Sequence, residues 1–247
     1  MAGVRVELPD RVIDHADERA AFFFATNISS VGANAYDART GTEPDSFTED
    51  DLTLINRTMM ARTAHKHWTD FTGASGQELA WLQALRPDWD LIAMSGEEWS
   101  AANCERHITT ALEQMMGRYR RAATVTKLLH LKRPRLIPIC DSYVASILGH
   151  NPLDVPRASQ LIAAVRDVGR DNRAALEEVS ARLRSLGIER SLIRILDALL
   201  WSSYRPGGAE IEFDRLLHEH YPNGFFFARE HIASEIAGSV PDQVPRA

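Results

Sequence analysis

Apolar residues recur at helical spacing along most of this chain. Ser46 and Glu49 have the spacing of a capping box, and the apolar positions after them predict a helix over about 48–68. Ser95 and Glu98 repeat this spacing before a second long amphipathic stretch, which predicts a helix over 97–120. Between the two, the pattern predicts a short helix over 77–85 that stops near Pro87.

The second half of the chain continues in the same way. Two short helices, over 124–131 and 142–148, flank the proline-containing segment KRPRLIPIC. Two further helices are expected to end at Gly169 and Gly187, where glycine is a typical C-terminal cap. The stretch SLIRILDALLWSS at 191–203 is the most apolar of all, so we expect it at the centre of the fold.

Alternating patterns typical of strands are scarce. They occur only in GVRVELP at 3–9 and AEIEFD at 209–214. The sequence therefore predicts a mainly α, multi-helix globule with at most a short β element near the N-terminus. We expect an N-terminal arm with helices over 1–94 and a helical domain over 95–247, or one domain throughout.

The amino-acid composition argues against several classes of protein. The 247 residues are 45% hydrophobic and 25% charged, with no apolar run long enough for a membrane span. Acids occupy the place where a signal peptide has its apolar stretch, so we expect a cytoplasmic protein without a membrane partner. Cys104 and Cys140 are too few for a four-thiolate site, and His218 and His220 lack an evident third ligand, so no metal and no cofactor are expected.

The net charge of −6 argues against a protein coated in positive charge, but one segment is basic. The 18 residues of 118–135 contain no acid and seven of the 28 Lys and Arg residues. Guanidinium and ammonium groups in such a cluster can contact DNA phosphates, or they can form a solvated face that pairs with the acidic remainder. The expected phosphate contacts are Arg118, Arg120, Arg121, Lys127, Lys132, Arg133 and Arg135.

A second group of candidates surrounds the end of the helix expected over 48–68. Arg57, Arg62 and Trp68 could bind an anion or stack on a base. The alternative is an ordinary helix terminus, with the tryptophan in the core.

Asp141 is the candidate for chemistry. It follows the apolar stretch LIPIC and opens the helix expected over 142–148, which is the position of a helix N-cap. A capping aspartate needs no catalytic role, but the same position holds one carboxylate rigidly beside a basic segment. Such a carboxylate can stabilise a cationic sugar or orient a water molecule.

The segment RAATVTKLLHLKRPRLIPICDSYVASILG, at 121–149, resembles the core of the helix-hairpin-helix (HhH-GPD) DNA glycosylase superfamily. Together with INRTMMART and ILDALLW it also resembles an uncharacterised bacterial family, which we expect to have a divergent version of that fold. The resemblance implies that Asp141 is the catalytic aspartate. It also implies that Ala123 stands where bifunctional members carry a lysine nucleophile, so a monofunctional enzyme is expected. The hairpin glycines of the superfamily are replaced by Tyr119, Arg120 and Arg121, so arginine side chains are expected to contact the phosphates.

These observations favour a DNA glycosylase-like enzyme that cleaves the N-glycosidic bond of a damaged or modified base. In this hypothesis Asp141 is the catalytic carboxylate and DNA is the partner. The alternative is a non-catalytic helical module that binds nucleic acid or a protein partner.

Overall fold

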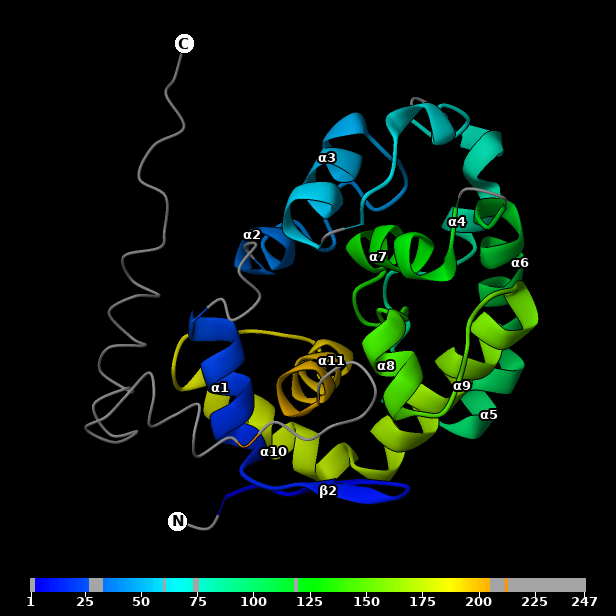
Figure 1. The fold of residues 1–247 in the computed structure, drawn as a ribbon. Helices are drawn as coiled ribbons and strands as arrows, with labels where there is room; N and C mark the ends of the chain where they lie inside the picture. Colours follow the sequence, from blue (N-terminus) through cyan, green and yellow to red (C-terminus); the bar gives the residue numbers. More distant parts are fainter. Residues whose placement is uncertain are drawn as a thin grey trace.

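The computed structural model describes residues 3–26, 33–59, 61–72, 76–117 and 120–204, together with Glu212. Within these residues the chain is mainly helical, with one two-stranded antiparallel sheet near the N-terminus (Figure 1). This confirms the mainly α fold with a short N-terminal β element. None of the described helices is long and apolar enough to cross a membrane.

The sheet is a hairpin of β1 (Val6–Leu8) and β2 (Arg11–Ile13), in which Val6 lies opposite Ile13. Val6 and Leu8 are buried while Glu7 between them is exposed, as expected for a sheet with one covered face. The Asn172 side chain accepts a hydrogen bond from the Glu7 N–H and donates one to the Glu7 carbonyl, both at 2.6 Å. These bonds attach the hairpin between two late helices. The other expected strand, 209–214, lies outside the described ranges apart from Glu212.

Helix α11 (Leu192–Ser203) is central, as the sequence predicts (Figure 1). It packs against α1 (Ala16–Thr26), α8 (Ser142–Ile147), α9 (Val155–Asp171) and α10 (Arg173–Arg184). Ten of its residues are buried, because neighbouring helices cover it on several sides.

The remaining helices come from the first part of the chain. They are α2 (Ala33–Asp37), α3 (Glu49–Thr58), the 3-10 helices η1 (His65–His67) and η2 (Gly76–Leu79), α4 (Ala80–Gln83), α5 (Gly96–Ala101), α6 (Cys104–Met115) and α7 (Ala122–Lys132). One of them, α6, packs against α9. One hydrophobic core contains residues from Val4 to Tyr204. Since α1 packs on α10 and α11, and α3 on α7, this core does not divide at 94/95.

The helix expected over about 48–68 begins where predicted, but it is only ten residues long and uses a different capping pair. Its N-cap is Thr48, which forms a capping box with Asp51, instead of Ser46 with Glu49. The helix ends at Thr58 because Asn56 bonds both the N–H and the carbonyl of Thr63, at 2.9 and 2.8 Å, and Arg62 has a φ of 51°. The chain therefore loops back after one short helix.

The helix expected over 97–120 is two helices. The capping box of Ser95 and Glu98 is confirmed, but α5 ends before Asn103, whose φ of 49° breaks the helical path. After α6, the backbones of Gly117 and Arg120 exchange two hydrogen bonds, of 3.1 and 3.2 Å. These bonds hold Gly117, after α6, beside Arg120, before α7.

The two expected glycine caps have different outcomes. Gly187, with a φ of 77°, ends the turn after α10 as predicted. Gly169 is inside α9 instead of at its end, and its lack of a Cβ admits the side chain of Ile92. The sequence position of this glycine reflects close packing and not a helix end.

Candidate active site

Asp141 is the N-cap of α8, as predicted. Its Oδ1 accepts hydrogen bonds from the backbone N–H groups of Tyr143 and Val144, at 2.9 and 3.2 Å. The buried stretch before it is held by a 3.0 Å bond from the Cys140 N–H to Thr126 Oγ1 on α7. Among the described residues Oδ2 has no hydrogen-bond partner, so one carboxylate oxygen caps the helix and the other is available.

A cavity of about 290 Å³ adjoins Asp141. This volume is at the lower end of the range of about 300–1,000 Å³ typical of small-molecule sites. Aromatic rings and charged groups line it together, from α1, α3, α7, α8 and α11. The lining residues are Phe23, Thr58, Met59, Ala123, Lys127, Ile139, Asp141, Ser142, Tyr143, Arg194, Asp197 and Trp201.

Lys127 belongs to this cavity and not to a phosphate-binding surface. The residue is buried, and its Nζ donates a 2.8 Å hydrogen bond to the Met59 carbonyl. Burial lowers the pKa of the Lys127 amine, while the carboxylates of Asp141 and Asp197 act in the opposite direction. A buried amine with a lowered pKa is a candidate for chemistry.

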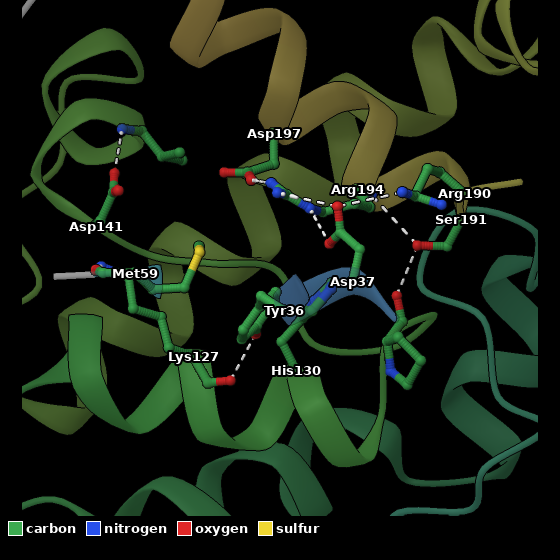
Figure 2. A network of polar contacts seen from close by, with 12 residues as sticks. Tyr36, Asp37, Met59, Lys127, His130, Asp141, Arg190, Ser191, Arg194 and Asp197 are labelled. Carbon is green, nitrogen blue, oxygen red and sulfur yellow. Dashed lines mark hydrogen bonds and ion pairs between the residues drawn. The ribbon is translucent and has the colours of Figure 1, made fainter. Parts of the chain in front are cut away.

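Asp197 contributes a second carboxyl group to the same cavity. It lies on α11 and pairs with Arg194 one turn before it, and Arg194 also bonds both oxygens of Asp37, at 2.8 and 3.4 Å (Figure 2). Arg190 adds a 3.2 Å bond to Asp37. These residues were not predicted from the sequence, although an Arg and an Asp three apart in the most apolar helix are a visible signal.

The environment of Asp197 raises the pKa of its carboxyl group. Burial raises the pKa of Asp197 to about 7; Arg194 opposes this shift and the Asp141 carboxylate adds to it. Asp197 therefore holds a proton in a substantial fraction of molecules at neutral pH.

Two of the expected phosphate contacts, Lys132 and Arg133, are interior residues, and that expectation is corrected. Lys132 pairs with Asp51 at 2.8 Å, and both side chains are 1% exposed. Arg133 donates to the carbonyls of Leu82, Leu85 and Pro44 and to the Asp45 carboxylate. These side chains connect α7 to the N-terminal part of the chain and cannot reach a ligand outside.

The other candidates divide into buried and exposed groups. Trp68 is 1% exposed and donates to Thr63 Oγ1, which agrees with a core residue and not with a base-stacking surface. The Arg120 guanidinium lies over the rings of Trp68 and Phe71, at 5.6 and 4.7 Å. Arg118 lies outside the described residues.

Three of the predicted arginines are exposed and lie close in sequence to residues that line the cavity. Arg57 precedes the lining residue Thr58 by one position, Arg62 follows Met59 by three, and Arg121 precedes Ala123 by two. Arg135 is also exposed, but it pairs with Asp90 at 3.1 Å beside a different cleft. The exposure of Arg57, Arg62, Arg121 and Arg135 is compatible with the predicted contacts to phosphate or base, which stay predictions.

That second cleft has a volume of about 650 Å³ and adjoins the other end of the ion-pair network. Three of its arginines are already paired with carboxylates, Arg173 with Glu177, Arg190 with Asp37 and Arg135 with Asp90, while Arg184 donates to Ser180 Oγ. A ligand anion would have to compete with these carboxylates, so the smaller cavity is the stronger candidate for chemistry.

No group of three or more His, Cys, Asp or Glu side chains suited to a metal ion occurs in the part of the chain that the structure describes. His218 and His220 lie outside that part. The described residues thus offer carboxyl, amine and guanidinium groups for chemistry.

One comparison with known proteins gave a match. The model of a family of unknown function (DUF6308) matches residues 16–204, a range that contains all the residues lining the cavity. No curated protein and no solved structure matches the chain.

Proposed function

This chain belongs to the DUF6308 family, and we propose that it is a DNA glycosylase-like enzyme that cleaves the bond between a base and its sugar. The observation that carries the proposal is the position of Asp141. One of its oxygens is fixed by the start of α8, and the other has no hydrogen-bond partner among the described residues, beside a cavity with an aromatic wall.

The aromatic wall supports binding of a base. The rings of Phe23 and Trp201 have centroids 5.8 Å apart, and those of Trp201 and Tyr143 are 5.4 Å apart. A base that leaves the DNA stack can stack on such rings, since every base has an aromatic face. A nucleotide in this cavity would have its sugar close to Asp141.

Asp141 has the chemistry that this reaction needs. As the bond to the base breaks, positive charge develops on the sugar ring, and a fixed carboxylate stabilises it. Because the helix amides already hold Oδ1, the carboxylate does not have to reorganise when that charge develops. The same group can accept the proton of the water molecule that attacks the sugar.

Two features near the cavity support contact with phosphates. Arg57, Arg62 and Arg121 are exposed cations in sequence next to lining residues. Helix α7 begins beside Ala123, and no side chain caps its first turn, so backbone N–H groups remain for an anion.

A second candidate function follows from Lys127, namely base removal with the amine as nucleophile. The sequence predicts a monofunctional enzyme because Ala123 occupies the nucleophile position of bifunctional glycosylases. Lys127, one turn further along α7, lines the same cavity and has a lowered pKa. In this alternative its amine would leave the Met59 carbonyl, bond to the anomeric carbon and form an imine.

The experiment measures release of free bases from DNA that contains uracil, hypoxanthine, oxidised or alkylated bases. Asp141→Asn preserves the cap but removes the full charge, so base release should fall about 10²-fold or more. The matched control is Asp154→Asn, because Asp154 caps α9 in the same way, away from the cavity, and bonds the Arg157 N–H at 3.0 Å. This control should retain full activity.

Borohydride treatment during the reaction separates the two candidates. A monofunctional enzyme gives no covalent adduct, whereas a Lys127 nucleophile gives one that Lys127→Met abolishes. Full activity of Asp141→Asn would exclude the catalytic role. If no base is released from any of these DNAs while DNA still binds, the non-catalytic module is the better description.

A further inference from the structure

We propose that Asp197 is a second catalytic carboxyl group, the acid that protonates the departing base. The inference rests on the proposed function and adds a residue role that the resemblance to glycosylases does not supply. It concerns bases that leave as anions and therefore need a proton at the moment of bond cleavage.

The first argument is position. Asp197 lies in the middle of α11 and Asp141 at the start of α8, and these two helices pack together. Both residues line the same cavity, and in Figure 2 the Asp197 carboxyl group points to the side on which Asp141 lies. One carboxyl group can thus face the sugar while the other faces the base.

The second argument is that one oxygen of Asp197 is available. Its Oδ2 accepts the hydrogen bond from Arg194 Nη1. Within the described ranges its Oδ1 takes part in no hydrogen bond. This oxygen is also not completely enclosed by the protein. This oxygen can therefore carry a proton and present it to a ligand in the cavity.

The third argument is that Asp197 is not the only counter-ion of Arg194, although Asp37 also pairs with Arg190. Arg194 already bonds both oxygens of Asp37. An additional buried carboxyl group costs desolvation energy that its attraction to Arg194 only partly offsets, so such a group is weak as a stabilising device. A buried acid of this kind that lines a cavity is a candidate for function.

Burial favours the protonated form of Asp197, and the charges around it act in both directions. Arg194 on the same helix lowers the pKa of Asp197, whereas Asp37 from α2 and Asp141 at the start of α8 raise it. Lys127 on α7 interacts electrostatically with both cavity carboxyl groups. Burial dominates and keeps the pKa near neutrality, whereas Asp141 has helix amides to stabilise its charge. Two carboxyl groups in different environments are the usual arrangement for acid and base roles.

The reaction then balances as follows. The bond between the anomeric carbon and the base nitrogen breaks, and its electron pair leaves with the base, which takes the proton of Asp197. Water adds to the anomeric carbon and gives a proton to Asp141. The products are the neutral base and a sugar with a hydroxyl group, and one proton passes from Asp141 back to Asp197 through solvent.

The test compares a base that needs a proton with one that does not. Uracil or hypoxanthine is the neutral base; a purine alkylated on a ring nitrogen carries a positive charge and leaves without an added proton. In Asp197→Asn, release of the neutral base should fall about 10²-fold or more, and release of the alkylated purine should stay within about fivefold of wild type. In the wild-type protein, release of the neutral base should also decline above pH 7 while release of the alkylated purine does not, a comparison that needs no variant.

The outcomes are distinct. Equal losses for both kinds of base in a folded Asp197→Asn protein would show a structural role and overturn this inference, as would wild-type activity on charged bases alone. If the wild-type protein releases no base of either kind, the proposed function itself fails. Activity that Asp141→Asn abolishes and Asp197→Asn leaves intact would refute only the role of Asp197.

Discussion

The fold keeps the buried side chain of His130 in its neutral form. Its Nδ1 lies 2.7 Å from the Ile137 carbonyl, so in the neutral ring Nδ1 carries the proton and donates it. The ring stacks on Tyr36, with centroids 5.9 Å apart, and the Tyr36 hydroxyl donates a 2.7 Å bond to the Lys127 carbonyl. Burial lowers the pKa of His130 to about 4, so the fold excludes its charged form.

This pKa predicts a loss of stability in acid. Between pH 6.5 and 4 the unfolded chain protonates His130 and the folded chain does not, so the free energy of unfolding falls as the pH falls. The contribution reaches on the order of 3 kcal/mol at pH 4. His130→Asn keeps a donor near Ile137. In this variant the free energy of unfolding, measured with urea from pH 7.5 to 4.5, should lose this part of its dependence on pH.

The matched control is His15→Asn, since the His15 side chain is exposed. It should follow the wild-type curve. An identical pH dependence in wild type and His130→Asn would show that the His130 pKa is not lowered.

At the scale of helices and turns, contacts between distant segments decide what local pattern leaves open. Two capping-box spacings overlap at the start of α3, and Thr48 with Asp51 is the one used, because Asp51 is also the buried partner of Lys132. The break at Asn103 likewise has no strong local signal.

The same reasoning explains which site residues the sequence could predict. Asp141 was predictable because an aspartate before an apolar helix is a local signal for an N-cap. The burial of Arg133 was not, since its partners Leu82, Leu85 and Pro44 are about 50 to 90 residues away. Asp197 had a local signal, as a charged residue paired with Arg194 in the most apolar helix, but its place beside Asp141 depends on the cavity, which no local pattern describes.

Packing of α9 gives a prediction at this scale. A Cβ on Gly169 would lie 2.7 Å from both Cδ1 and Cγ1 of Ile92. Gly169→Ala should therefore lower the free energy of unfolding by about 1–3 kcal/mol, despite the better helix propensity of alanine. Thermal or urea unfolding measures this, and Ile92→Ala in the same chain should remove most of the additional loss.

Gly96→Ala is the control, because the nearest atom to a Cβ there is Arg170 Nη1 at 4.0 Å. That variant should be neutral or slightly stabilising. A Gly169→Ala protein as stable as wild type would mean that Ile92 moves aside without cost.

At the scale of the whole molecule, the fold buries some basic residues and exposes others, and a count of charges along the chain does not show which. Several cations of the basic segment are internal, with Lys132 and Arg133 joining α7 to residues 44–51 and 82–85. Three exposed cations that are close in sequence to lining residues come from separate segments, at Arg57, Arg62 and Arg121. Since the net charge is −6, DNA binding would depend on this small group.

Salt dependence tests this distribution. If the three arginines contact phosphates, Arg57→Glu, Arg62→Glu and Arg121→Glu should each reduce the slope of log affinity against log salt by about 1. Fluorescence anisotropy with short DNA between 50 and 200 mM salt measures the slope. Arg86→Glu is the control, since Arg86 is exposed and pairs with Asp88 away from the cavity; an equal effect of this variant would point to non-specific attraction.

Residues from distant parts of the chain line the cavity, so the cavity can form only after nearly all of the described chain has been synthesised. The lining residues extend from Phe23 on α1 to Trp201 on α11, almost the whole length of the described chain. During synthesis, α8 and its Asp141 cap can form while α11 is still missing, but the wall closes only after residue 201 has left the ribosome. Contacts so distant in sequence also delay folding. A nascent or truncated chain would therefore carry the carboxylate without the cavity, and if the proposed function holds, such a chain would have no place for a base.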